Sequence, residues 1–130
     1  MCACELKIVT MSGAQEEVFQ TEGAFERENG SERVRYLIDG DEGELMFSQD
    51  SLEMRRRGKC GLQAIFCEGK TGELLLSDSV LQGKIPVRTT HYRLKEEAFQ
   101  KAIELDYELF EADNIQKFSL KIQIFFSEEK

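Results

Sequence analysis

The feature that most constrains this chain is an alternation of apolar and polar residues with a period of two. Two stretches show it clearly, with apolar Ile103, Leu105, Tyr107 and Leu109 in the first and Phe118, Leu120, Ile122, Ile124 and Phe126 in the second. Successive side chains of a strand point to opposite faces, so each stretch predicts a strand with one face buried and the other in solvent. The chain therefore belongs to the β-rich proteins.

Shorter runs with the same alternation precede these two strands. They comprise Phe19, Thr21 and Phe25; Val34, Tyr36 and Ile38; Leu45 and Phe47; Leu52 and Met54; and Leu62, Ala64 and Phe66. Gly23 interrupts the first run, and a glycine inside a strand predicts a bulge or a sharp bend. With turn signals such as Asn29-Gly30 and Asp39-Gly40, about ten short strands favour an antiparallel meander, closed into a barrel or folded into a sandwich.

Two segments depart from this pattern. Residues Lys95 to Ala102 are rich in helix formers, but the segment is short and precedes a strongly alternating strand. It predicts a turn or a single helical turn. Pro86 has no N–H to donate to a neighbouring strand, so its segment should begin a strand or lie at an edge or a bulge.

Length and charge narrow the class further. The 130 residues show no repeat, linker or boundary, so residues 1–130 are expected to form a single domain. The net charge of −8 would repel a phosphate backbone, which argues against nucleic acid as a partner. No apolar run approaches the ~20 residues that cross a bilayer, and the first ten residues lack an export signal. We expect a cytoplasmic protein without a membrane partner.

Several segments together resemble a known family. They are Glu17 to Gly23 with Val34 to Leu37, Arg56-Arg57-Gly58 after Leu52-Glu53-Met54, Phe66 to Gly69, Val87 to Thr89, Ile103 to Leu109, and the C-terminal strand. In their order and spacing, residues 17 to 126 resemble the YwiB-like family of small bacterial proteins of unknown function. The resemblance implies a calycin-like (lipocalin-related) up-and-down antiparallel β-barrel of about 8–10 strands, and it implies no activity.

Neither a metal nor a cofactor is indicated by the residues. Cys2 and Cys4 form a C-x-C pair, whereas Cys60 and Cys67 lie six residues apart, so the knuckle spacing of a structural zinc site is missing. We expect four free thiols in a reducing compartment. The glycine-containing turns lack the spacing of a phosphate-binding loop, so no cofactor is expected.

Arg56 is the residue that stands out, because Arg55, Arg56 and Arg57 reverse the local charge of an acidic chain. If the apolar residues of this segment face the barrel, parity turns Arg56 inward as well. It should then either lie at a barrel mouth or pair with an inward carboxylate such as Glu22 or Glu26, or else bind the anionic group of a ligand. Both interpretations stay open at the level of sequence.

Three hypotheses follow for function. The first is non-enzymatic binding of a small apolar or anionic ligand inside the barrel, with Arg56 as anchor and Tyr36 and Tyr107 in the wall. The second is an interaction module with a filled barrel, whose acidic outer strand (Glu104, Asp106, Glu108) meets a basic partner or a second copy in a homodimer. The least favoured is an enzyme that uses His91, the only histidine, because no nucleophile motif accompanies it. We therefore assign no catalytic residue, and we keep His91 as a candidate ligand contact.

Overall fold

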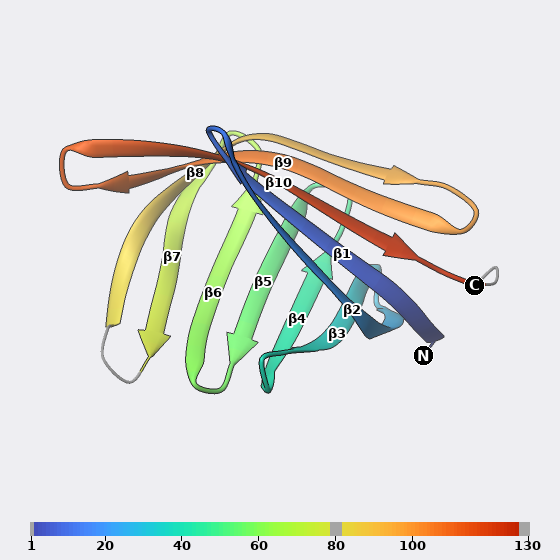
Figure 1. Ribbon diagram of the computed structural model, residues 1–130. Coiled ribbons are helices and arrows are strands. Elements are labelled where there is room, and N and C mark those ends of the chain that lie inside the picture. The colour runs from blue at the N-terminus through green and yellow to red at the C-terminus, as the bar shows by residue number, and fades with distance from the viewer. Residues whose placement is uncertain (1, 79–81, 128–130) are drawn as a thin grey trace.

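The computed structural model describes residues 2–78 and 82–127, and these residues form ten strands and no helix (Figure 1). The strands are β1 (Cys2–Ser12), β2 (Gln15–Glu28), β3 (Ser31–Ile38), β4 (Asp41–Phe47), β5 (Ser51–Arg57), β6 (Cys60–Cys67), β7 (Thr71–Asp78), β8 (Gln82–Glu96), β9 (Gln100–Glu111) and β10 (Asn114–Phe125). Each strand pairs antiparallel with the next, and β1 also pairs with β10, which closes the barrel. The predicted all-β up-and-down barrel is confirmed.

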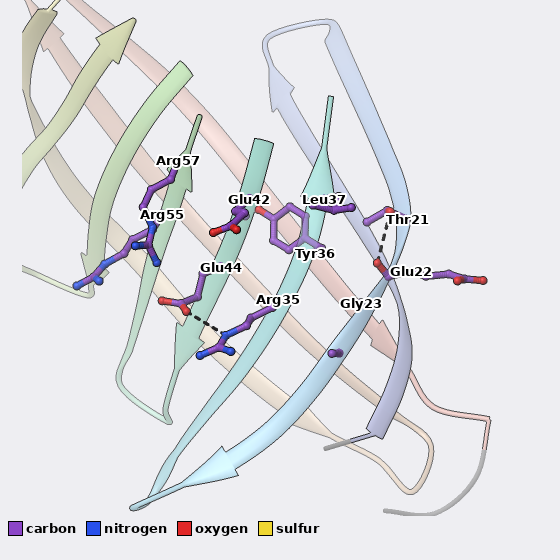
Figure 2. A pocket seen from close by; sticks show the side chains of 12 residues that line it. Thr21, Glu22, Gly23, Arg35, Tyr36, Leu37, Glu42, Glu44, Arg55 and Arg57 are labelled. Carbon is purple, nitrogen blue, oxygen red and sulfur yellow. Dashed lines mark hydrogen bonds and ion pairs between the residues drawn. The ribbon is translucent and has the colours of Figure 1, made fainter. Parts of the chain in front are cut away.

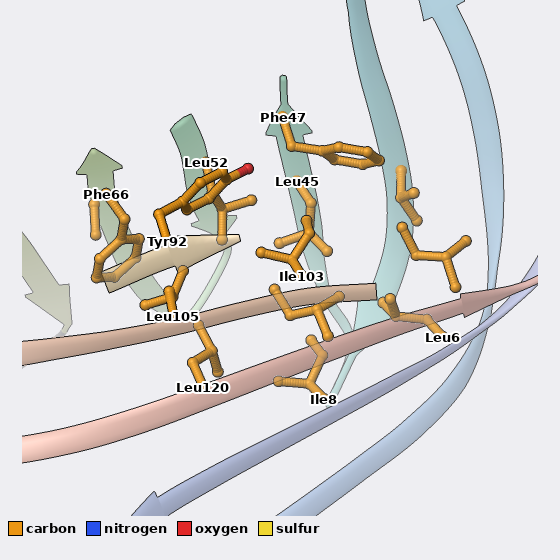
Figure 3. Packing of buried hydrophobic residues seen from close by; sticks show 14 of the residues in the cluster. Leu6, Ile8, Leu45, Phe47, Leu52, Phe66, Tyr92, Ile103, Leu105 and Leu120 are labelled. Carbon is orange, nitrogen blue, oxygen red and sulfur yellow. The ribbon is translucent and has the colours of Figure 1, made fainter. Parts of the chain in front are cut away.

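The core lies inside the barrel, on the face that the alternation assigned to it. Leu6, Leu45, Leu52, Ile103 and Ile122 are each at most 1% exposed, and Figure 3 shows side chains from several strands meeting there. Burying one such side chain contributes about 1.5–3 kcal/mol. The fold is thus held by one apolar interior with polar residues on its outer face.

Two long strands, β2 and β8, pair with their two neighbours over different parts of their length. In β2 the pairing with β1 covers Gln15 to Phe25, whereas the pairing with β3 begins only at Gly23. No bulge interrupts the register at Gly23, so of the two predicted alternatives, a bulge or a sharp bend, the bulge was wrong. The glycine is needed because β3 approaches closely: a Cβ there would lie 3.0 Å from the carbonyl oxygen of Arg35 and 3.0 Å from Cγ1 of Val34.

In β8 the register shifts between Thr89 and His91, which leaves Thr90 as an extra residue opposite β9. Thr89 and Tyr92 both face inward, and His91 is therefore turned to the outer surface. Pro86 pairs with Glu73 of β7 in a part of β8 that β9 does not reach, so it lies at an edge as predicted. The bulge therefore decides which side of the wall the only histidine occupies.

The tight turns follow the local sequence. Asn29-Gly30 and Asp39-Gly40 each have positive φ at both residues, the geometry of the two-residue turn that best joins twisted antiparallel strands. Residues 95–102 form the end of β8, a turn and the start of β9, so the predicted turn is present and the alternative helical turn is not. The described residues contain no helix, and therefore no helix that could span a membrane.

Candidate functional site

The two ends of the barrel differ in how well they cover the interior. At one end the inward side chains of Phe47, Leu52, Ile103 and Ile124 are at most 2% exposed. Toward the other end several inward side chains are only partly buried, namely Phe19, Met54, Ile85, Tyr107 and Phe118. Figure 1 shows the β1–β2 and β9–β10 turns far from the β3–β4 and β5–β6 turns, so the wall spreads at this open end.

Arg56 lies at the open end, and its partner is Asp41. Its Nε donates to Oδ2 of Asp41 over 2.9 Å, and the Asp41 side chain is only 4% exposed. Asp41 also accepts hydrogen bonds from the backbone N–H groups of Lys59 at 2.9 Å and Cys60 at 3.2 Å. These two backbone donors, followed by Arg56, hold the pKa of Asp41 below its ordinary value, so the carboxylate stays charged.

The carboxylates expected beside Arg56 lie elsewhere. The odd-numbered residues of β2 face inward there, so Glu22 is on the outer surface and Glu26 pairs with Arg33 at 3.2 Å. Within the described chain, Nε is the one guanidinium nitrogen of Arg56 that makes a hydrogen bond. Since its side chain is 24% exposed, the two terminal amino groups remain available to a ligand.

The position of Asp41 explains why residue 58, two positions after Arg56, is a glycine. The residue has a φ of 144°, and a Cβ at this position would collide with the carboxylate of Asp41. The β5–β6 turn therefore closes around Asp41 only if residue 58 has no side chain. Sequence reasoning identified the Arg-x-Gly pattern but not its carboxylate, because Asp41 comes from a different hairpin.

Tyr36 is the second predicted site residue, and it lies beside Arg56. Gly43 of β4 pairs with Tyr36 on one side and with Arg56 on the other, so all three face the interior in one row. The ring of Tyr36 covers Gly43, where a Cβ would collide with it. Burial raises the pKa of Tyr36, and the nearby charge of Arg56 partly opposes that rise. Phe19 lies 6.0 Å from Tyr36 between ring centroids and extends this wall.

Tyr107 belongs to an aromatic cluster elsewhere in the wall. Its ring stacks on Phe118 with centroids 5.2 Å apart and contacts Phe66 at 4.9 Å. Burial raises the pKa of Tyr107 to about 12, so its phenol is neutral at physiological pH. The open end thus combines apolar aromatic surface with one arginine.

His91 does not join this group. Its side chain is 50% exposed on the outer face, and its Nδ1 lies 3.5 Å from Oε1 of Glu68. Asp106 lies between His91 and Ser119 in the row of paired residues, and Ser119 Oγ donates to Asp106 over 2.7 Å. In a catalytic triad the hydroxyl of the nucleophile forms a hydrogen bond to the histidine, whereas the Ser119 hydroxyl donates to Asp106. These three residues therefore lack the geometry of a catalytic triad.

The negative charges on the outer face of β9 are balanced by basic residues of the neighbouring strands β8 and β10. Glu104 lies between Arg93 and Lys121 and forms an ion pair with Lys95 at 3.1 Å. Glu108 lies between Arg88 and Lys117. The outer face around β9 is therefore a set of alternating acidic and basic residues and not an acidic surface. This could not be predicted from the sequence of β9 alone, because it depends on the register with β8 and β10.

The buried charges at the closed end were missed by sequence reasoning. Nζ of Lys101 is 2.8 Å from Glu32 and 3.1 Å from Glu96, and the Lys101 side chain is fully buried. Glu32 also accepts from Arg27 at 2.9 Å. The alternation in the sequence could have predicted that both charges are buried, because Lys101 lies on the same strand face as Ile103 and Glu32 on the same face as Val34.

The cysteines do not form a metal site. All four are free thiols, and β1, which carries Cys2 and Cys4, pairs with β2 and β10 rather than with β6. Across the described residues, no group of three or more His, Cys, Asp or Glu side chains is placed to hold a metal ion. Cys4 is buried, which raises its pKa to about 11.

A separate groove of about 710 Å³ crosses the outer face of β2 to β5 (Figure 2). It starts where β2 and β3 diverge, at Thr21 and Glu22, and includes Leu37, which is 64% exposed. Its charged residues balance: Arg35, Arg55 and Arg57 against Glu22, Glu42 and Glu44. Tyr36 and Gly43 also line this groove, so it borders the residues of the open end although its charged side chains lie on the outer face.

The fold and the site define an antiparallel β-barrel with one closed end and one aromatic, arginine-bearing open end. The chain belongs to the family described as a domain of unknown function (DUF1934), whose model matches residues 5–124. Its structure is similar to the crystal structure of the ywiB protein from Bacillus subtilis, with a TM-score of 0.76 and 13% sequence identity over 96% of this chain and 90% of that one. The resemblance seen in the sequence is confirmed. No curated protein matches the sequence.

Proposed function

We propose that this protein is a non-enzymatic cytoplasmic binding protein that holds a small, mainly apolar, anionic ligand at the open end of its barrel. The observation that carries the proposal is the state of Arg56. Asp41 accepts a hydrogen bond from its Nε and fixes its position, the two terminal amino groups form no hydrogen bond among the described residues, and Tyr36 lies in the same row across Gly43. A positioned guanidinium is suited to a carboxylate, sulfonate or phosphate group.

The closed end limits where such a ligand lies. Its interior is filled by apolar side chains and crossed by the Lys101–Glu32 ion pair, so the ligand would occupy the open half only. Tyr36 and Tyr107 would supply apolar contact area and remain uncharged because burial raises both pKa values. Binding sites of this kind are mostly apolar with a few placed polar groups.

His91 has no part in this site, because it lies on the outer surface. The four free thiols suit a reducing compartment such as the cytoplasm.

The test compares two adjacent arginines on one strand. Arg56→Gln removes the inward guanidinium, and Arg57→Gln removes an outward one. The probes are 8-anilinonaphthalene-1-sulfonate, which is apolar and anionic, and N-phenyl-1-naphthylamine, which is apolar and neutral. A charged hydrogen bond contributes about 1.5–3 kcal/mol, so Arg56→Gln should weaken sulfonate binding by roughly ten- to a hundredfold.

The neutral probe and the matched variant serve as controls. Arg56→Gln should keep its affinity for the neutral probe, which shows that the wall is intact, and Arg57→Gln should bind both probes as the wild type does. If the two variants bind the sulfonate equally, Arg56 is not the anchor and the proposal fails.

A further inference from the structure

The edge of β2 is open along eight residues. β1 pairs with β2 from Cys2↔Phe25 to Ser12↔Gln15, but β3 reaches β2 only between Gly23 and Glu28. Among the described strands, Gln15–Glu22 therefore has a neighbour on one side only. About half of its residues aim their N–H and C=O groups at the unpaired side, because antiparallel pairing uses alternate residues on each edge.

Space for another strand exists beside this edge. Past Tyr36, β3 turns away with β4, and the outer groove opens between the two diverging strands, bordered by Thr21, Glu22 and Leu37 (Figure 2). Most side chains of Gln15–Glu22 are exposed, and Val18 is 51% exposed on the outer face. An extended segment can thus approach the edge and place its end in the groove.

The negative charge of this edge indicates which kind of segment would bind to it. Gln15–Glu22 contains Glu16, Glu17 and Glu22 and no basic residue, while the adjoining groove is balanced. A second copy of the chain would bring the same three carboxylates and a further net charge of −8, so self-pairing along this edge is opposed. A basic segment would be attracted, both at a distance and in cross-strand pairs.

We propose that Gln15–Glu22 is a docking site for an extended, basic segment of another protein, which adds to the barrel as a further strand. Backbone hydrogen bonds to β2 would supply much of the affinity, and lysine or arginine side chains opposite Glu16 and Glu22 would supply the selectivity. The strand borders the open end through Phe19, but the proposal does not require that a ligand binds there.

A comparable free edge on β10 provides an internal control. Of the strands that the structure describes, only β9 pairs with Asn114–Phe118, because β1 reaches β10 from Ser119 onward. This segment carries Lys117 and no acidic residue. A basic strand should therefore choose β2 and leave β10 unoccupied.

The experiment titrates ¹⁵N-labelled full-length protein with synthetic peptides of alternating lysine and valine. Amide shifts should change along Gln15–Glu22 and at Leu37, and not along Asn114–Phe118. A peptide with glutamate in place of lysine should not bind. A lysine–valine peptide methylated on alternate backbone nitrogens should also fail, because it keeps the charge but cannot form the ladder.

Charge reversal completes the test. Glu16→Lys with Glu22→Lys should weaken peptide binding about tenfold, while the same reversal at exposed Glu73 and Glu111 should change it less than about twofold. Equal binding of the methylated peptide, or shifts along Asn114–Phe118 in place of Gln15–Glu22, would overturn the proposal. So would a wild-type dimer in sedimentation that the peptide dissociates, since a second copy would then be the occupant.

Discussion

Replacing Lys101 with methionine tests how the closed end is held together. Lys101 is fully buried between Glu32 and Glu96, with its Nζ 5.8 Å from the centroid of the Phe25 ring. Methionine fills a similar volume without charge. Removing one partner of a buried pair costs about 3–5 kcal/mol. Here Glu32 keeps Arg27, and Glu96 is 47% exposed and can turn to water, so we expect about 2–3 kcal/mol.

The predicted loss in the free energy of unfolding sets the expected change in Tm. For a chain of this length the entropy of unfolding corresponds to a shift of roughly 3–4 °C per kcal/mol, so Tm should fall by about 6–12 °C. Chemical unfolding followed by far-UV circular dichroism gives the free energy directly. The double variant with Glu32→Leu should recover much of the loss, because an apolar pair can replace a buried ion pair. A loss below about 0.5 kcal/mol in Lys101→Met, or a double variant no more stable than the single one, would refute this reasoning.

The same pair predicts a dependence on acid. Burial raises the pKa of Glu32, but hydrogen bonds from Lys101 and Arg27 outweigh burial and hold the pKa below 4.5. A carboxyl with a lowered pKa in the folded state stabilises the protein above its unfolded pKa. This stabilisation is lost as the pH falls below about 4.5 and through the folded value. Unfolding measured between pH 7 and pH 3 should therefore show a smaller loss in Lys101→Met than in the wild type.

Three further changes test other parts of the structure. Gly58→Ala should destabilise by more than about 1 kcal/mol in chemical unfolding, because its Cβ meets Asp41 at positive φ, and a stability equal to wild type would contradict this. Tyr92→Phe should cost about 1–2 kcal/mol, because the hydroxyl donates to the carbonyls of Ser48 at 2.7 Å and Ser51 at 2.9 Å, which close the β4–β5 turn; an unchanged midpoint would show that this contact is dispensable. At pH 8 exposed Cys60 should react with a disulfide reagent well before Cys4, which is buried and has a pKa of about 11, and mass mapping that finds Cys4 modified first would exclude the packing described for β1.

The fold could be predicted because its determinants are local. Alternation assigns each strand its buried face, and the Asn29-Gly30 and Asp39-Gly40 dipeptides assign the turns. Closure of the barrel needed the resemblance to a family, since alternation alone left a sandwich open.

The candidate site was harder to predict because it depends on register between distant strands. Parity turned Arg56 inward correctly, but its partner Asp41 belongs to another hairpin and no pattern near Arg56 points to it. The bulge at Thr90 decides that His91 faces outward, and nothing around it in the sequence marks a bulge. Lys101 and Glu32 could have been found by extending parity to charged residues, since each continues an apolar face.

The most direct test of ligand binding at the open end is native mass spectrometry of the protein purified from its own cells, compared with Arg56→Gln prepared in the same way. The wild type should carry an added mass on its 14.9 kDa chain that disappears on denaturation, and the variant should carry much less of it. A wild type that shows only the bare chain, or a variant that retains the same added mass, would contradict an arginine-anchored ligand in this barrel.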